Sequence, residues 1–316
     1  MSSALRAAAI TTLGVAAAAA VYATVFERRA YRVRREIVPV LSPGAAPISV
    51  LHISDLHLAP WQSEKVAWLR SLASLKPDLI INTGDNLGHI DALPALSEAL
   101  LAFDGLPGVF VHGSNDYFAP TPKNPLRYLA GPSKGETETA VQLDTDALES
   151  VLSERLGWHS LNNAVAQLRI NGSILEFMGT NDAHRGWDRL DLLPGLVDAL
   201  RELDDDDTDN PAVMIGVTHA PYQRVLNAFT TQRADVIFAG HTHGGQVCLP
   251  GFGAIITNCD LPRDRARGLS VWNHAHQASY LNVSAGIGTS IYAPVRFACP
   301  PEAVLVTLVG DDIGYS

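Results

Sequence analysis

The chain has 316 residues, 47% hydrophobic and 18% charged, which is enough to bury a large core and suits one catalytic domain with an appendage. Its formal net charge is −10, and the first 40 residues carry six arginines against two glutamates, a net +4 that leaves −14 for the remainder. So acidic a body repels nucleic acid backbones, which excludes them as expected partners, and three cysteines without close spacing argue against a disulfide framework.

The N-terminal segment has the length and polarity of a membrane span. Residues 7–26 are 20 uncharged, mostly apolar positions, about the number of helical residues that crosses a bilayer core. Five arginines follow within residues 28–35 and only Arg6 precedes, which predicts a single-pass cell-membrane protein with its catalytic domain on the cytoplasmic face. A cleaved signal is the alternative, because residues 18–23 are mostly small, and the protein would then be exported. We therefore expect an anchor or signal segment at residues 1–30 and a catalytic domain at residues 31–316.

Alternating apolar runs and helix-like stretches predict an α/β fold. Residues 31–41 mix β-branched residues with arginine and end at a Pro-Gly turn, which is typical of a strand. Further strands are predicted at 48–54, 79–83, 109–112, 174–178, 213–217, 236–239, 280–283 and 303–308, and helices at 64–75, 93–103 and 146–156. The composition of residues 120–146 predicts a long loop, and that of the acidic residues 202–209 a solvated loop.

Polar side chains follow the ends of several predicted strands, where loops commonly carry catalytic groups. In chain order they are Asp55, His57, Asp85, Asn115, Asp116, His219, His241 and His243. In the D-x-H and H-x-H pairs, both side chains lie on one face if the backbone is extended. A carboxylate such as Asp85 can offer an oxygen to each of two ions, and imidazoles are neutral ligands that leave the ions their positive charge. Two such ions orient a phosphoryl group, neutralise its charge and activate water.

The ordered set of motifs resembles the calcineurin-like metallophosphoesterase family over residues 48–310. The motifs are Asp55/His57, Gly84/Asp85, Asn115/Asp116, His219 and Gly240/His241/Thr242/His243. The resemblance implies a two-sheet β-sandwich flanked by helices, here preceded by an N-terminal transmembrane helix. Together with Gly244, Gly245 and Gln246, the N-terminal segment is similar to the membrane-associated subgroup, whose members include enzymes that cleave the pyrophosphate of UDP-diacylglucosamine.

The resemblance also implies a set of metal ligands for a pair of divalent ions, with Mn, Fe and Zn as the candidates. Asp55, His57 and His243 would hold the first ion, Asp85 would bridge, and a further set would complete the second ion, namely Asn115, His219 and His241. We expect the catalytic chemistry to depend on Asp85, Asn115 and Asp116.

The third motif departs from the family, which usually has Gly, Asn, His and then an acidic residue where this chain has Gly113, Ser114, Asn115 and Asp116. Either Asn115 or Ser114 takes the ligand role, and we favour Asn115 because an amide carbonyl is the better neutral oxygen ligand. The usual histidine is absent, and a positioned general acid typically contributes about 10²- to 10⁴-fold. We therefore expect a substrate whose leaving group is already weakly basic.

Several other side chains are candidates either for substrate binding or for a structural role. His89 is a candidate for substrate binding, and Arg296 is either a phosphate ligand or a surface ion-pair partner. His52 and His112 are expected in the core, and His184, which follows another predicted strand end, is a candidate substrate contact. A second H-x-H pair, His274 and His276, is expected on an exposed hairpin.

The favoured function is hydrolysis of a phosphorylated small-molecule or lipid-linked substrate at the membrane, where the basic residues after the anchor would contact anionic lipid. The alternative is a metal-binding pseudo-enzyme that acts as a membrane scaffold. The missing histidine motivates that alternative, and the seven retained ligands speak against it.

Overall fold

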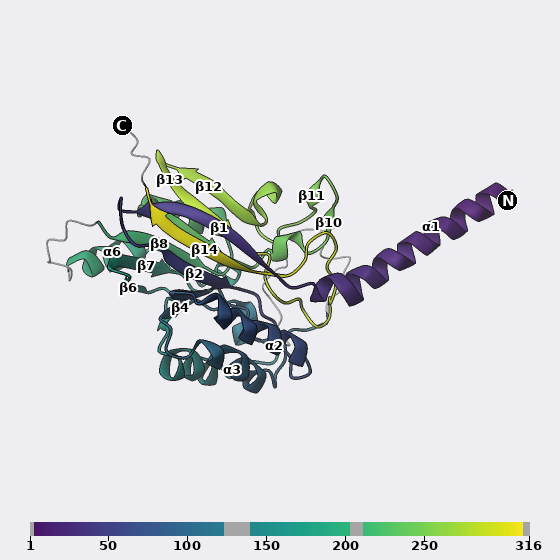
Figure 1. Ribbon diagram of the computed structural model, residues 1–316, viewed down its shortest axis with the longest axis horizontal. Helices are drawn as coiled ribbons and strands as arrows, with labels where there is room; N and C mark the ends of the chain where they lie inside the picture. The colour runs from purple at the N-terminus through teal and green to yellow at the C-terminus, as the bar shows by residue number, and fades with distance from the viewer. Residues whose placement is uncertain (1–2, 123–139, 203–210, 312–316) are drawn as a thin grey trace.

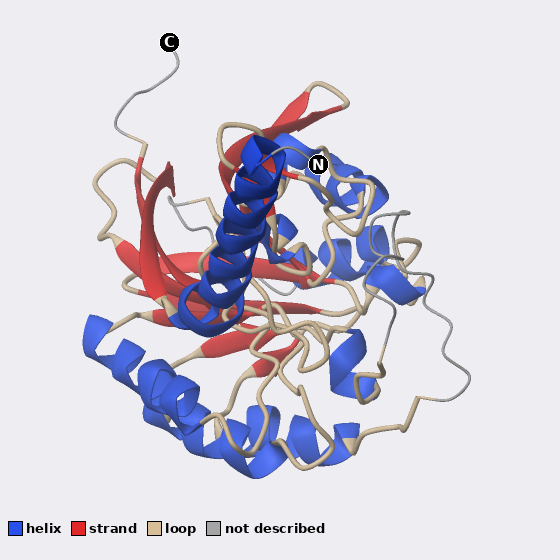
Figure 2. Cartoon of the chain, turned by 90° about the vertical axis from the view of Figure 1, so that its right-hand side faces the viewer, coloured by secondary structure: helices blue, strands red, loops and turns tan. Residues whose placement is uncertain are grey.

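The computed structural model describes residues 3–122, 140–202 and 211–311 (Figure 1). Two six-stranded sheets pack face to face, and helices lie on their outer sides (Figure 2). The expected α/β sandwich of two sheets flanked by helices is therefore confirmed. Most of the predicted loop at 120–146 and nearly all of the acidic stretch at 202–209 lie outside the described residues.

The first sheet has the strand order β1-β14-β2-β3-β4-β5. Its strands are β1 (Arg32–Leu41), β14 (Glu302–Gly310), β2 (Ile48–Ile53), β3 (Leu79–Asn82), β4 (Gly108–Phe110) and β5 (His159–Ser160). Because β2, β3 and β4 are parallel, their carboxyl ends meet at one edge of the sheet. The loops that carry the first three predicted motifs therefore lie side by side.

The second sheet has the order β12-β13-β9-β8-β7-β6 and brings the remaining motifs together in the same way. Its strands are β12 (Gly268–His274), β13 (Gln277–Val283), β9 (Val236–Ala239), β8 (Val213–Thr218), β7 (Ser173–Gly179) and β6 (Val165–Ile170). Here β7, β8 and β9 are parallel. The turn between β12 and β13 carries His274 and His276 on an exposed hairpin, as predicted.

The core has a layer between the sheets and a layer under each group of helices. Val50, Ile81, Phe177, Ile215 and Phe238 belong to the layer between the sheets, where each contributes roughly 1.5 to 3 kcal/mol of burial. The helices are α2 (Ser63–Ser71), α3 (Leu93–Leu100), α4 (Ser114–Tyr117), α5 (Thr145–Glu149), α6 (Leu193–Glu202) and α7 (Gln223–Thr231). The predicted helix at 146–156 continues beyond α5 as a π-helical turn, Ser150–Arg155.

The chain begins with α1 (Ser3–Val21), which projects from the domain and continues through a π-helical and a 3₁₀ turn to Arg29 (Figure 1). Within the described residues this one helix is long and apolar enough to cross a membrane, a test by length and composition that a signal sequence would also pass. Its large apolar side chains are exposed, Ile10 to 71% and Leu13 to 70%.

The basic residues that follow α1 are not all available to lipid. Arg34 donates to Glu302 at 3.0 Å, to Glu36 at 2.6 Å and to the Asn282 side chain at 3.1 Å. Arg32 contacts the same buried Glu302 at 3.3 Å. These ion pairs hold β1 against β14, so Arg32 and Arg34 have a structural role that their sequence position did not reveal.

Candidate metal centre

Loops at the carboxyl ends of the parallel strands carry the candidate ligands. Asp55 and His57 follow β2, Asp85 follows β3, His219 follows β8, and His241 and His243 follow β9. Five of these residues have left-handed backbone, with φ of 50°, 40°, 54°, 68° and 49° for Asp55, His57, Asp85, His241 and His243. The side chains therefore converge through tight turns, and the extended backbone considered for the D-x-H and H-x-H pairs does not occur. Such residues are uncommon and concentrate at functional sites.

The first group of ligand atoms comes from both sheets. One atom each of Asp55, His57 and His243 lies within 4.8 Å of the others, and all three residues are buried. The Nε2 atoms of His57 and His243 are 3.3 Å apart, and Nε2 of His243 is 3.5 Å from Oδ1 of Asp55. This spacing can hold a single cation among one carboxylate and two imidazoles.

The second group shares Asp55 with the first and adds Asp85 and His219. The Nδ1 of His219 lies 2.8 Å from the Thr83 carbonyl, which orients the ring so that Nε2 faces Oδ2 of Asp85 at 3.6 Å. The same Asp85 oxygen is 3.5 Å from Nε2 of His57, so this carboxylate lies between the two groups. His241 lies beside the second group, with its Nδ1 at 3.3 Å from Nε2 of His219.

Burial controls the protonation of the imidazoles. It lowers the pKa of His57, His241 and His243 to about 4, so these rings are neutral near pH 7 and have a lone pair for a cation. Burial also opposes a charge on His219, but the carboxylates of Asp85 and Asp55 raise its pKa to about 9. Metal binding therefore requires that His219 release a proton.

Three buried polar atoms of the centre have no hydrogen-bond partner among the described residues, namely Oδ1 of Asp55, Nδ1 of His57 and Nδ1 of His243. Burying an unpaired polar group costs about 1 to 3 kcal/mol. A cation beside Oδ1 of Asp55 would give that oxygen a partner. The donors are oxygens and imidazole nitrogens without thiolate, a set that suits Mn, Fe or Zn. These residues therefore fit divalent metal ions.

Gly113 shows how tightly the centre is packed. A Cβ at this position would collide with the Asp85 carboxylate and approach Nε2 of His219 to 2.7 Å. Only glycine leaves room for both side chains. This close approach explains a glycine at the start of the third motif.

The two ligand candidates of the third motif point in different directions. The Asn115 side-chain amide contacts Oδ2 of Asp85 at 2.7 Å, and its backbone N–H donates to Oδ1 of Asp85 at 2.8 Å. The Ser114 hydroxyl instead donates to the carboxylate of Asp182. Asn115 therefore borders the metal centre, whereas Ser114 is held by Asp182.

Asp116 is fully buried, and its position does not fit the direct catalytic role expected for it. Its carboxylate accepts backbone N–H groups of Asp85 at 2.8 Å, Asn86 at 2.7 Å and Gly113 at 3.0 Å. Behind it, His112 lies 3.6 Å from Asp116 and 2.9 Å from Glu149. Asp116 thus joins the loops after β3 and β4 and positions Asp85.

Both interpretations of Arg296 are wrong. The residue is fully buried, and its guanidinium donates to the carbonyls of Ala285, Gly286, Gly288 and Cys299 at 2.7 to 3.3 Å. It is thus neither on the surface nor open to phosphate. Arg296 instead organises the loop after β13, which lies against Asp55.

The other histidines divide between core and centre. His52 is buried between the Thr83 hydroxyl and the Asn282 amide, each at 2.9 Å, and His112 is buried as described, so the core prediction is confirmed for both. The ring of His89 packs edge-on against Trp61, and its expected contact with substrate stays a prediction.

Sequence reasoning missed Asp182 and placed His184 only as a guess. Asp182 is buried and holds both Ser114 and the backbone N–H of His184. The ring of His184 lies 4.6 Å from that of His241, and its Nδ1 is 3.0 Å from the Tyr222 hydroxyl. Both residues follow the end of β7, and the strand-end pattern that indicated His184 gave no role to Asp182.

Comparisons with known proteins add four similarities. A family model described as calcineurin-like phosphoesterase matches residues 48–245. The chain is 27% identical to the protein YpbG of Bacillus subtilis, over 85% of this chain and 84% of that protein. It is 26% identical to a Chlamydia muridarum protein named UDP-2,3-diacylglucosamine pyrophosphatase LpxG, over 82% of this chain and 83% of that one. A solved dimetal phosphatase from Danio rerio is 11% identical over 79% of this chain and 88% of its own, with a TM-score of 0.41.

Proposed function

Because the chain belongs to the calcineurin-like phosphoesterase family, we propose that it uses two divalent metal ions to hydrolyse a phosphoester or phosphoanhydride. One observation carries the proposal. Two groups of candidate ligands share Asp55, and the Asp85 carboxylate lies within 3.6 Å of an imidazole from each group. A pair of adjacent ions needs such shared carboxylates.

The ligands have distinct roles in this proposal. Asp55, His57 and His243 hold one ion, and Asp55 also faces the second group. Asn115, His219 and His241 hold the other ion, with Asp85 between the two ions. When bound, the ion pair polarises the phosphoryl group and lowers the pKa of water. The neutral imidazoles add no negative charge, and the left-handed turns at Asp55 and Asp85 keep both carboxylates at the junction.

The chemistry of the third motif restricts the substrate. Asn115 has no acidic proton to donate to a leaving group, and the motif lacks the family's usual histidine. We therefore propose a substrate with a weakly basic leaving group, such as a nucleotide phosphate in a phosphoanhydride. Aryl phosphodiesters should then react much faster than alkyl ones, and equal rates for both would contradict the restriction.

We further propose that the substrate is lipid-linked or nucleotide-like and is met at a membrane. Support comes from the apolar helix at the N-terminus and from the similarity to a protein named UDP-2,3-diacylglucosamine pyrophosphatase. In this proposal, residues 1–30 are the anchor and residues 31–316 the catalytic domain, on the cytoplasmic side because arginines follow the apolar segment. N-terminal sequencing of the mature protein tests the alternative of a cleaved, exported form.

The deciding experiment is turnover of an aryl phosphodiester with added Mn²⁺ by wild type, Asp85→Asn and a control, Asp104→Asn. Asp104 is a half-exposed carboxylate that pairs with Arg155, so its loss should leave activity unchanged. We expect Asp85→Asn to lose more than about 100-fold, since even residues that only orient metal ligands typically contribute about 10- to 100-fold. Absence of wild-type turnover with every metal would favour the scaffold alternative.

A further inference from the structure

A small β-ribbon exposes an apolar tip. Strands β10 (Cys248–Leu249) and β11 (Gly253–Ala254) form a hairpin whose tip, residues 249–253, has the sequence Leu-Pro-Gly-Phe-Gly. All five tip residues are exposed, with Leu249 at 49% and Phe252 at 62%, and none is charged. An exposed apolar tip is unfavourable in water and indicates a contact surface.

The hairpin is tied to the point where α1 leaves the domain. Residues 296–299 form the link, because the backbone N–H of Arg296 donates to the Ala23 carbonyl at 3.1 Å and that of Cys299 to the Glu27 carboxylate at 2.6 Å. On the other side of the link, the Phe297 carbonyl accepts the backbone N–H of Cys248, the first residue of β10, at 2.8 Å. Figure 1 accordingly shows β10 and β11 at the same end of the domain as the base of α1.

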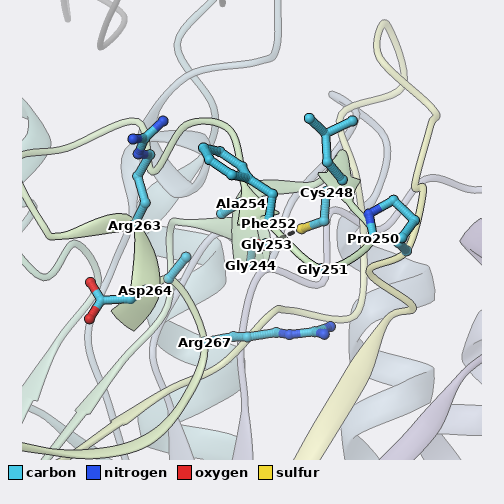
Figure 3. A pocket seen from close by; sticks show the side chains of 13 residues that line it. Gly244, Cys248, Pro250, Gly251, Phe252, Gly253, Ala254, Arg263, Asp264 and Arg267 are labelled. Atoms are coloured by element: carbon cyan, nitrogen blue, oxygen red, sulfur yellow. Dashed lines mark hydrogen bonds between the residues drawn. The ribbon is translucent and has the colours of Figure 1, made fainter.

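Two arginines, Arg263 and Arg267, lie beside the hairpin together with Asp264 (Figure 3). A cavity of about 330 Å³ lies beside it and is lined by the tip and by Arg263 and Arg267. The exposed Arg263 places its guanidinium 5.2 Å from the centre of the Phe252 ring. Apolar side chains next to arginines are typical of segments that lie at the boundary between lipid headgroups and acyl chains.

We infer that the β10–β11 tip contacts the bilayer surface beside α1, with Leu249 and Phe252 at the acyl boundary and Arg263 against lipid phosphates. When α1 spans a bilayer, the residues at its base, near 22–29, lie at the headgroup level. The link through residues 296–299 holds the hairpin at that level. The inference rests on the proposed membrane location of α1 and does not depend on the hydrolytic activity.

Charge complementarity favours a bilayer as the occupant. The sequence after residue 40 has a net charge of −14, which would repel an anionic surface at most orientations. The end of the domain near α1 instead has four arginines, Arg28, Arg29, Arg263 and Arg267, against two nearby carboxylates, Asp264 beside the hairpin and Glu64 paired with Arg29. Contact through this end turns the acidic surface away from anionic lipid and fixes the orientation of the domain.

The test places an environment-sensitive fluorophore at Phe252→Cys in the full chain, reconstituted into lipid nanodiscs that contain a lipid-borne nitroxide quencher. Ile37→Cys is the matched control, because Ile37 is an equally exposed apolar residue at 67%. It lies five residues along β1 from Arg32, about 16 Å further from the helix base. Wild type corrects for labelling of the three buried cysteines.

We expect quenching at position 252 to be several times that at position 37, and Arg263→Glu to weaken it in discs with anionic lipid. Equal quenching at the two positions would overturn the inference. A probe at 252 that is shielded from water but not quenched by lipid would reveal a protein occupant and also overturn it. Failure of the chain to remain in the discs would remove the premise about α1, while turnover of the aryl diester would still report on the proposed function.

Discussion

The two sheets contribute unlike halves of the candidate centre. Among the candidate ligands, the first sheet supplies both carboxylates and the amide, from the loops after β2, β3 and β4, together with His57. The second sheet supplies three imidazoles, from the loops after β8 and β9. Each group of ligand atoms contains residues from both sheets. The negative charge of the candidate ligands therefore comes from the first sheet, and neither sheet alone provides a complete group of ligand atoms.

Removing the carboxylate that both groups share should have the largest effect. Asp55→Asn takes one negative charge from each group, because both include Asp55. We expect the purified variant to retain almost no metal by elemental analysis and to lose more than about 10³-fold in turnover, beyond the roughly 10²- to 10³-fold typical of single groups that stabilise transition-state charge. Circular dichroism serves as the control for folding. A variant that keeps both ions would show that the first sheet is not the source of affinity.

Removing one imidazole of the second sheet should reduce turnover less than Asp55→Asn does, and it should affect one of the two ions. His241 contacts His219 and, in the proposed arrangement, holds the second ion only. We expect His241→Ala to bind one ion per chain where wild type binds two, and to lose about 10²- to 10³-fold in turnover, as for other single groups that stabilise transition-state charge. His276→Ala, at the exposed β12–β13 turn, is the matched control. Loss of both ions would show that the two groups do not bind independently.

A smaller loss of turnover should follow when Asp116, which positions loops of the first sheet, is changed. Asp116 contacts no candidate ligand side chain by a hydrogen bond, but it holds the backbone of Asp85 and Gly113. Asp116→Asn should therefore reduce turnover by about 10- to 100-fold while the metal content falls less than in Asp55→Asn. Asp104→Asn again controls for loss of a carboxylate. If turnover is unchanged, the loop positions do not depend on Asp116.

The candidate ligands were easier to predict from the sequence than the residues that position them. Asp85 and Asp116 both follow short apolar strands, and nothing in their spacing tells which one faces the metal. The difference arises because Asp116 meets backbone N–H groups some 30 residues earlier in the chain. Arg296 was misread for the same reason, since its partners are carbonyls of a loop that encloses it. Such roles depend on tertiary contacts that local patterns do not encode.

Some strands and helices were likewise easier to predict from the sequence than others. Strands with continuous apolar runs, such as β2, β8 and β9, were predicted because both their faces are buried between layers. The strands β6 and β12 were missed, since each is only partly buried and carries several polar residues. The helices α6 and α7 were also missed, although their apolar positions pack on the second sheet.

The final prediction concerns the stability of the fold. It tests whether the first sheet's half of the centre makes that stability depend on pH. Burial opposes a charge on His112, yet Asp116 and Glu149 raise its pKa from 6.5 to about 9. A raised pKa in the folded state stabilises the fold fully below pH 6.5, and this contribution is lost as pH rises towards 9. The free energies of unfolding of wild type and His112→Gln, measured with urea, should differ by an amount that shrinks by on the order of 3 kcal/mol between pH 6.5 and pH 9.

His276→Gln, at the exposed β12–β13 turn, is the control for replacing a histidine with glutamine. A difference between wild type and His112→Gln that stays constant with pH would mean that His112 is neutral in the folded protein. In that case the Asp116 carboxylate would be held by backbone N–H groups and the Asn86 side-chain amide, and the first sheet would position Asp85 without a buried charge pair behind it.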